Sequence, residues 1–396
     1  MSVSDDLNNY MKDGTPPKGW EEYAETIGQI GSAIVKLPRP KSSEKDLLTT
    51  AGFDPKEWKI NGPVQTRRWM NYVGDWLYYF KFDVIQGESE EEKNLDIQQM
   101  VDDLRERRPA ISNIETDGDC FAFFMSDLQL GKKSNGITSQ NIVDWYVDCV
   151  DQAVSRIGHL RDAGHKIPHG AIIGLGDIVE NCFGFYKNQQ YLIDMNQREQ
   201  NQVARQLLRY TINALGPKFD KLTVAAIGGN HGERRDDGKV KTDAADNMDL
   251  EVFDAVKEAY DQSGIQLDWQ IAGENLSMAL NLGGTNVGIA HGHTFGSGVN
   301  SAARAEKWMK NQVWGMQEVS DCTVLVHGHW HHYSNLQSGG RHLIQAPALD
   351  AGSKWYTDYS GEASEPGVLT MRFDKNHSFG YDDLKIIVPR NMRKGN

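Results

Sequence analysis

The segments GGNHGE (228–233), AHGHTFG (290–296) and VHGHWHH (326–332) together hold seven of the twelve histidines in the chain. Two further polar segments stand upstream of them, MSDLQLGK (125–132) and LGDIVEN (175–181). Each of the five follows a short apolar, β-branched run, which predicts that each is the loop at the end of a β-strand. Imidazoles, carboxylates and an amide gathered at strand ends are the ligands that divalent cations take from proteins. The pattern therefore predicts a metal centre.

Strands and helices alternate around these segments from Asp117 onward, which predicts an α/β fold. Such folds place sheets at the centre and helices outside, and here we expect a β-sandwich flanked by helices. The expected strands are 121–126, 171–175, 222–227, 277–282, 286–290, 323–326, 343–345, 368–373 and 384–388. One expected helix begins at Ser139, and three others cover 189–215, 247–262 and 302–316. Since ligands bind beyond the carboxyl ends of the strands in open α/β sheets, the five polar segments can meet at one edge.

The chain before residue 116 has a different character. Residues 1–45 are expected to form an N-terminal arm with one helix at 20–35. Residues 46–115 are expected to form an accessory region with two short helical pieces around Gly52 and Pro55, an aromatic strand at 76–85 and an acidic linker. Two interpretations stay open: a cap on the main domain, or a helix-turn-helix-like module that brings Arg67 and Arg68 to nucleic acid. Residues 116–396 form the predicted catalytic domain.

Charge and composition narrow the range of partners. The net charge of −13 argues against non-specific coating of nucleic acid. It does not exclude a local site for a polyanion, because bound divalent cations add positive charge there. The four cysteines form no CxxC pair, and no apolar run is long enough to cross a bilayer. We expect a cytoplasmic protein without a membrane partner; the sequence does not predict the oligomeric state.

In chain order the five segments read D-x-Q, G-D-x-x-E, G-N-H, H-G-H and G-H-x-H. This pattern resembles the calcineurin-like metallophosphoesterase superfamily over residues 118–350. The resemblance implies a metallophosphoesterase-type β-sandwich with two divalent cations, bridged by a hydroxide, that cleaves phosphate mono- or diesters.

The resemblance also assigns roles to individual residues of this chain. It implies that Asp177 bridges the two metals and that Asp127 and His331 bind the first. The second metal would be bound by Asn230, His291 and His329. His231 would be catalytic without binding metal, by stabilising the charge of the scissile phosphate or by protonating the leaving oxygen.

The chain departs from the family pattern at Gln129, where the family has a histidine. An amide oxygen suits a hard cation better than zinc, so we expect Gln129 as a metal ligand and manganese or magnesium at the first site. The alternative is that Gln129 does not touch metal and leaves the first site weak. For the protein as a whole we expect two divalent cations, with manganese preferred and magnesium, zinc or iron left open.

A second departure is Gly232, which displaces the acidic residue after G-N-H by one position to Glu233. Glu233 is expected to orient a metal ligand or His231, or to lie on the surface. The full set of residues expected to support the ligands or to contact the substrate is Glu180, Asn181, Glu233, Arg234, Arg235 and His293.

The substrate is predicted from a closer resemblance, carried by GDIVENCFGFYKNQQ (176–190), SDLQLGK (126–132) and GFDPKEW (52–58). These segments resemble metallophosphoesterases of tailed bacteriophages, and through them the Mre11/SbcD nucleases. The resemblance implies a phosphodiesterase or nuclease acting on DNA or RNA, in the host cytoplasm if the chain is phage-encoded. The aromatic residues of the first segment, Phe183, Phe185 and Tyr186, are candidates for stacking on bases. Two alternatives stay open: a phosphodiesterase or phosphatase of a small nucleotide, and a weakly catalytic or non-catalytic nucleic-acid-binding protein with an altered first metal site.

Overall fold

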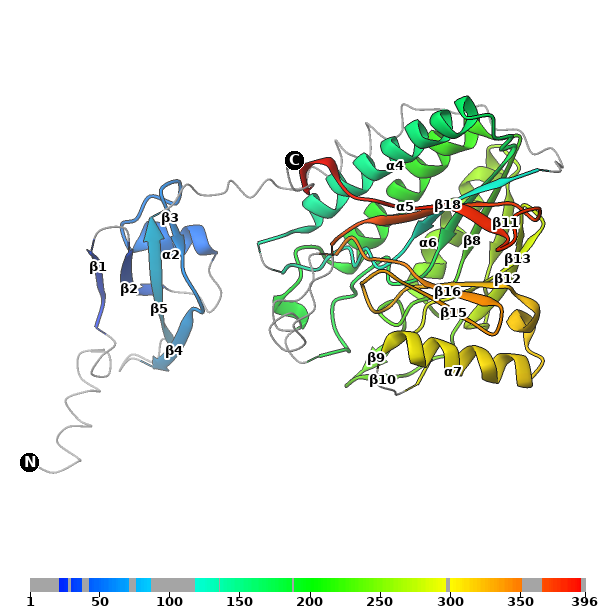
Figure 1. Cartoon of the computed structure of the whole chain (residues 1–396). Helices are drawn as coiled ribbons and strands as arrows, with labels where there is room; N and C mark the ends of the chain where they lie inside the picture. The colour runs from blue at the N-terminus through cyan, green and yellow to red at the C-terminus, as the bar shows by residue number, and fades with distance from the viewer. Residues whose placement is uncertain are drawn as a thin grey trace, which may run out of the picture. The chain divides into compact units, whose positions relative to one another are not determined.

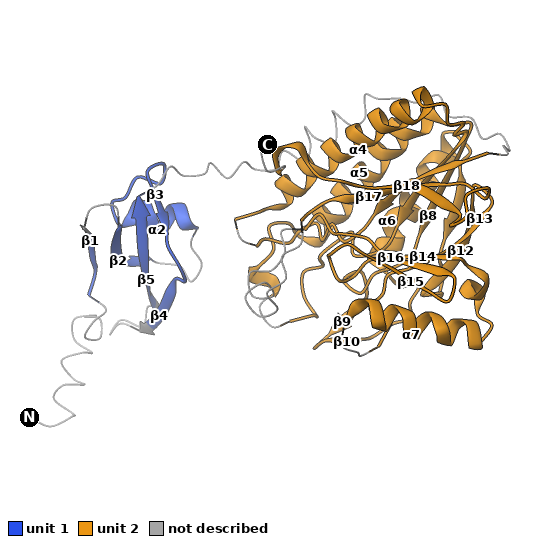
Figure 2. Cartoon of the chain, in the orientation of Figure 1, with its two compact units in different colours: residues 1–96 blue, residues 97–396 orange. Residues whose placement is uncertain are grey.

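The structure, a computed structural model, falls into two compact units, residues 1–96 and 97–396 (Figure 2). It describes residues 21–27, 30–37, 43–70, 76–86, 118–134, 136–186, 189–296, 300–350 and 365–392. Most of the expected N-terminal arm and nearly all of the expected acidic linker lie outside these residues. No helix within them is long and apolar enough to cross a bilayer.

The first unit is a small antiparallel sheet with a short helix against it. Its strands run in the order β1-β2-β5-β3, and β4 also pairs with β5. The strands are β1 (Tyr23–Ile27), β2 (Ile30–Leu37), β3 (Trp58–Ile60), β4 (Gln65–Met70) and β5 (Trp76–Gln86). Helix α2 (Glu44–Thr50) begins with a capping box between Ser43 and Asp46. Its buried leucines, Leu47 and Leu48, pack with Val35, Phe80 and Phe82 of the sheet.

Part of the expectation for this region is wrong. The helix expected at 20–35 is replaced by β1 and β2, and the second helical piece expected near Pro55 is a turn. Gly31 explains the first difference, because a Cβ atom there would lie 2.5 Å from the carbonyl oxygen of Glu25, and glycine disfavours a helix. Helix α2 is the one helix among the described residues of this unit, so these residues contain no helix pair. The cap and helix-turn-helix interpretations of residues 46–115 stay predictions. The aromatic strand expected at 76–85 is confirmed as β5.

Two sheets form the centre of the second unit (Figure 1). The first has the order β11-β8-β7-β6-β17-β18 and the second the order β12-β13-β14-β16-β15. The parallel strands of the first sheet are β6 (Cys120–Met125), β7 (His169–Gly174), β8 (Lys221–Ala226) and β11 (Asp268–Ile271). Its other two strands are antiparallel to their neighbours, namely β17 (Val368–Phe373) and β18 (Tyr381–Ile387). In the second, β13 (Thr285–Ala290), β14 (Val324–His327) and β16 (Arg341–Gln345) are parallel, with β12 (Ser277–Leu282) and β15 (Ser334–Ser338) antiparallel at the edges.

Helices cover the outer faces of both sheets (Figure 1). Helices α4 (Ser139–Asp162), α5 (Gln197–Leu215) and α6 (Met248–Gln262) pack on the first sheet, and α7 (Ser301–Trp314) packs on β15 and β16 of the second. The remaining elements are the hairpin β9 (Arg235–Asp236) with β10 (Lys239–Val240) and the 3-10 turns Gln189–Tyr191, Gly216–Lys218, Glu318–Asp321 and Arg390–Met392.

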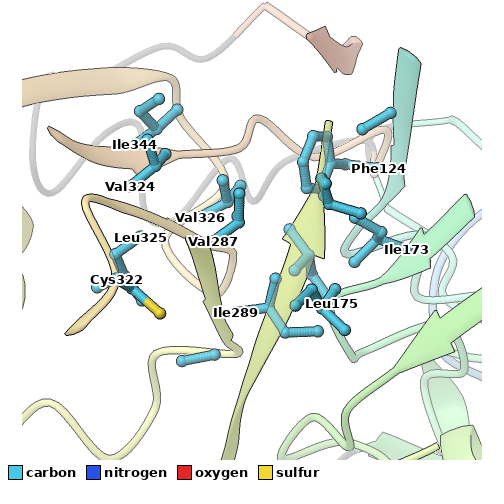
Figure 3. Close-up of a cluster of buried hydrophobic side chains, with 14 of the residues drawn as sticks. Phe124, Ile173, Leu175, Val287, Ile289, Cys322, Val324, Leu325, Val326 and Ile344 are labelled. Atoms are coloured by element: carbon cyan, nitrogen blue, oxygen red, sulfur yellow. The ribbon is translucent and has the colours of Figure 1, made fainter. Parts of the chain in front are cut away.

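The main core lies between the two sheets, and β6 shows how the sequence builds it. Cys120, Ala122 and Phe124 face the inter-sheet core, where Figure 3 draws Phe124 near Ile173 and Leu175, with Ile289 and Val326 from the second sheet. Phe123 faces the helices instead and meets the ring of Tyr146 edge-on. A strand buried on both faces reads as a continuous apolar run rather than an alternating one. The expected α/β sandwich with outer helices therefore matches the observed arrangement.

The clearest difference in this unit concerns the helix expected at 189–215. Helix α5 begins at Gln197, because Asn196 and Glu199 form a capping box that fixes its first turn. Residues Gln189–Tyr191 form a separate 3-10 turn. Strands β11 and β15 were not expected.

Candidate metal centre

All five polar segments lie at the carboxyl ends of strands, as expected. Asp127 follows β6, Asp177 follows β7, Asn230 follows β8, His291 follows β13 and His329 follows β14. The structure brings the two sheets together at this edge, since His291 Nε2 lies 3.0 Å from Asp177 Oδ2 and 3.1 Å from Asn230 Oδ1. Residues that are distant in sequence thus share one site.

The loops that carry these side chains have unusual backbone conformations. Nine described non-glycine residues have positive φ angles, and six of them belong to these segments. The six are Asp127 (50°), Gln129 (42°), Asp177 (52°), Asn181 (69°), His329 (78°) and His331 (61°). Such conformations cost energy and persist where the surroundings hold them, which is typical of functional sites. Tight packing contributes here, because a Cβ atom on Gly229 would collide with the backbone nitrogen and carboxylate of Asp177.

Asp177, Asn230 and His291 direct three potential ligand atoms, Oδ2, Oδ1 and Nε2, at one point. Asp177 Oδ2 is buried and lies 3.0 Å from His291 Nε2. Burial lowers the pKa of His291, but the Asp177 and Asp127 carboxylates outweigh it and raise that pKa to about 9, so without a cation Nε2 carries a proton. His291 Nδ1 lies 2.7 Å from the carbonyl oxygen of Leu175 and donates to it, which aims Nε2 at the two oxygens. A divalent cation in the place of this Nε2 proton would be bound by two buried oxygens and an imidazole nitrogen.

His329 completes this group. Among the His, Cys, Asp and Glu side chains of the described ranges, Asp177, His291 and His329 form the one group whose ligand atoms all lie within 4.8 Å of one another. Burial and the neighbouring His291 lower the pKa of His329 to about 3, so its imidazole is neutral and able to bind metal. Burial alone would raise the pKa of Asp177, but His291 and His231 outweigh it and hold that pKa well below its usual range. An aspartate, an asparagine and two histidines fit a divalent transition metal.

The residues expected at the first site are arranged differently. Asp127 is fully buried, and its carboxylate accepts hydrogen bonds from Ser126 Oγ and from the backbone nitrogen of His329. His331 Nε2 lies 3.4 Å from Asp127 Oδ1, and its Nδ1 lies 3.0 Å from Asp350 Oδ1. The Gln129 amide oxygen accepts a hydrogen bond from Lys132 Nζ at 2.6 Å. Asp350 was not singled out in the sequence, because it follows no motif and reaches the site only through the fold.

Asp249 is a second residue that the sequence analysis missed. Its buried carboxylate accepts four backbone hydrogen bonds, from Asp177, Ile178 and Gly229 at 2.8–3.0 Å and from Val179 at 3.3 Å. It therefore ties the loop after β7 to the loop after β8, which carry the ligands Asp177 and Asn230. The capping position at the start of α6, two residues after Asn247, was its only signal in the sequence.

His231 lies beside the metal ligands with its imidazole held on two sides. Its Nδ1 lies 3.1 Å from both the carbonyl oxygen and the Oε2 atom of Glu180, and its backbone nitrogen donates to Asp177 Oδ1. Phe185 stacks on the imidazole with centroids 4.4 Å apart, and the Arg235 guanidinium covers the far face of Phe185. Burial lowers the pKa of His231, but the Glu180 and Asp177 carboxylates outweigh it and raise that pKa to about 9. The imidazole is thus protonated at neutral pH.

The remaining expected residues support the loops to different degrees. Asn181 Nδ2 donates to the carbonyl oxygens of His231 and Glu233, so it braces the His231 loop. Glu233 pairs with Arg235 and lies 3.5 Å from His293 Nε2. Arg234 instead pairs with the exposed side chains of Asp246 and Glu251 and is not brought into the site.

No family model and no curated protein matches this chain. Several solved structures do, at low identity. A Streptococcus pneumoniae protein described as an uncharacterized, predicted phosphoesterase has 13% identity, a TM-score of 0.29, and covers 65% of this chain and 86% of its own. Vps29 from Entamoeba histolytica in complex with zinc has 12% identity, a TM-score of 0.29, and coverages of 63% and 84%. A structure described as a novel archaeal phosphodiesterase has 11% identity, a TM-score of 0.31, and coverages of 67% and 99%. Identities and TM-scores this low do not indicate a function for this chain, so its function is inferred from the side chains of the site.

Replacing Asp249 by asparagine is expected to loosen the ligand loops. The amide keeps one acceptor oxygen for four backbone donors, and each buried donor left without an acceptor costs about 1–3 kcal/mol. We expect a lower urea midpoint and manganese binding weakened by about 10- to 100-fold, as for other residues that orient metal ligands. The matched control is Asp246→Asn at an exposed position near the start of α6. Unchanged manganese affinity in Asp249→Asn, by calorimetry, would contradict this role.

Replacing Glu180 by glutamine is expected to lower the pKa of His231, because the carboxylate 3.1 Å from Nδ1 stabilises the imidazolium. If the protonated imidazole is the active form, activity is lost as the pH rises through this pKa. The alkaline limb of the kcat/KM profile should therefore move to lower pH by about one unit or more. Glu258→Gln, at an exposed position of α6, should leave the limb in place. A limb that stays fixed in Glu180→Gln would remove Glu180 from this role.

Proposed function

We propose that this chain is a metal-dependent phosphoester hydrolase of the calcineurin-like metallophosphoesterase type, acting as a phosphodiesterase. The observation that carries the proposal is the convergence of Asp177 Oδ2, Asn230 Oδ1 and His291 Nε2 on one point, beside a protonated His231. When bound, a divalent cation supplies Lewis acidity toward a phosphoryl oxygen and toward water. Manganese is the cation we propose, since carboxylate, amide and imidazole donors together suit it.

In this proposal His231 acts on the substrate directly. Its Nδ1 proton is held by Glu180, so Nε2 is the atom that can donate a proton to the leaving oxygen or a hydrogen bond to the phosphoryl group. The stacked Phe185 ring fixes the plane of the imidazole, and Arg235 holds that ring from its other face. A preorganised donor of this kind needs no rearrangement when charge develops on the phosphate.

The substrate we propose is a nucleic acid, with a small nucleotide as the alternative. Phe185 is engaged within the site by His231 and is not available to stack on bases, whereas Tyr186 donates its hydroxyl to Glu180 and is 42% exposed. Phe183 of the same loop is 68% exposed and remains a candidate stacking platform. The net charge of −13 favours a short or single-stranded substrate over coating of long duplex DNA.

Replacing His231 by glutamine tests the catalytic assignment. We expect metal content to stay at the wild-type level and turnover to fall by about 100-fold or more, because a proton donor or charge stabiliser is lost. Asp177→Asn should instead lose metal as well as activity, since it removes a buried ligand charge. Full turnover in His231→Gln would contradict the assignment.

The substrate class can be tested on the metal-stripped full chain with manganese, magnesium or zinc added back. Bis-p-nitrophenyl phosphate reports on the generic diester, and labelled single- and double-stranded DNA and RNA oligonucleotides report on nuclease activity. Phe183→Ala should raise the KM for an oligonucleotide and leave the generic diester unaffected, whereas Phe379→Ala, remote in sequence and also exposed, should change neither. Cleavage of the generic diester alone would indicate a small-nucleotide enzyme. No cleavage with any metal would refute a hydrolase and favour a nucleic-acid-binding role.

A further inference from the structure

Lys132 lies among the side chains expected to bind a first metal ion. Its ammonium donates to the Gln129 amide oxygen at 2.6 Å and makes a close ion pair with Asp350 Oδ2. The lysine side chain is 18% exposed and that of Asp350 is 4% exposed. An ammonium so far removed from water is stable only when it is well paired.

The hydrogen-bond network extends from Lys132 through the other expected first-site ligands. Asp350 Oδ1 lies 3.0 Å from His331 Nδ1, and His331 Nε2 lies 3.4 Å from Asp127 Oδ1. The other Asp127 oxygen accepts from Ser126 Oγ. The acceptor atoms that a first metal would need, on Gln129 and Asp127, therefore already have donors from this chain.

The second site contains no such ammonium among the contacts of its described ligands. Asp177 Oδ2 is buried and lies 3.0 Å from His291 Nε2, so its neighbour here is another expected metal ligand and not an ammonium. The same edge of the fold thus holds one set of expected ligands that is joined to a lysine ammonium and one set whose members contact each other. The group of ligands within 4.8 Å of one another in the described ranges contains His291 and His329 but neither Asp127 nor His331.

The charge on Lys132 also disfavours a cation at Gln129. The ion pair with the buried Asp350 carboxylate holds the side chain as an ammonium. A divalent cation bound to the Gln129 amide oxygen would lie beside an ammonium that is hydrogen-bonded to the same atom. Like charges repel strongly in a poorly hydrated environment.

We propose that the Lys132 ammonium takes the place of the first metal ion, so that this chain binds one divalent cation, at Asp177, Asn230, His291 and His329. Gln129 is then an acceptor for lysine and not a metal ligand. Asp350 and His331 become positioning residues that hold the ammonium and the Asp127 carboxylate. This inference rests on the metal site of the proposed function and does not depend on the substrate.

The count of bound metal tests the proposal without any substrate. Metal-stripped full chain is titrated calorimetrically with manganese, and bound manganese is measured by elemental analysis after gel filtration. We expect one manganese per chain in the wild type, one in Asp127→Asn and none in Asp177→Asn. Two manganese ions in the wild type, falling to one in Asp127→Asn, would overturn the proposal.

A gain-of-site experiment tests the role of the ammonium itself. Gln129→His alone restores an imidazole but keeps the lysine, so it should still bind one manganese. Gln129→His combined with Lys132→Met also removes the charge and should bind two. The control is Gln129→His with Lys133→Met, which removes the charge of the exposed neighbouring lysine and should bind one. A second ion in Gln129→His alone, or one ion in a double variant whose circular dichroism matches the wild type, would overturn the proposal.

The two proposals fail in distinguishable ways. A chain that binds one manganese and cleaves no phosphodiester would refute the proposed function and support the single-metal site. A chain that cleaves diesters and binds two manganese ions would do the reverse.

Discussion

The site depends on a carboxylate, Asp177, that is buried almost completely at the junction of two sheets. A buried carboxylate is stable only if positive charge or hydrogen-bond donors compensate for lost water. Here Oδ1 accepts a hydrogen bond from the backbone N–H of His231, and Oδ2 lies 3.0 Å from His291 Nε2, which in turn lies 3.1 Å from the Asn230 amide oxygen. The fold therefore holds a carboxylate, an amide oxygen and an imidazole at one point, which is a ligand set that a divalent cation can bind.

Holding that carboxylate in place shapes the neighbouring loops. Asp177 and His329 adopt positive φ angles, and the Asp249 carboxylate gathers four backbone N–H groups from the loops after β7 and β8. The charged form of Asp249 is itself destabilised, because its burial and the nearby Asp177 carboxylate raise its pKa to about 6. Strained φ angles and neighbouring carboxylates of this kind are typical of sites whose ligands must stay in position. Near Asp127, the Lys132 ammonium is paired with Asp350 and donates a hydrogen bond to the Gln129 amide oxygen. This oxygen is therefore held in position by a donor from the protein.

The parts of this structure that follow from local sequence were predictable. Continuous apolar runs such as Phe121–Met125 predict doubly covered strands, and the polar segment after each one falls where parallel strands end. The His231 neighbourhood was predicted only in outline, because the stacking of Phe185 and Arg235 depends on how two loops meet. Asp350 and Asp249 were missed since each reaches the site across a long stretch of chain, with no motif to mark it. The first hairpin was mistaken for a helix because β2 pairs with β5, a strand much later in the chain, and residues 20–35 alone do not show that pairing.

The central claim is that Asp177, Asn230, His291 and His329 form a divalent cation site at the edge of the two sheets. Its most direct test is an anomalous difference map from crystals of the full chain grown with manganese. The account predicts a strong peak bounded by these four side chains, with ligand distances typical of a transition metal. A map without a peak there, or with its strongest peak at Asp127 and Gln129, would contradict it.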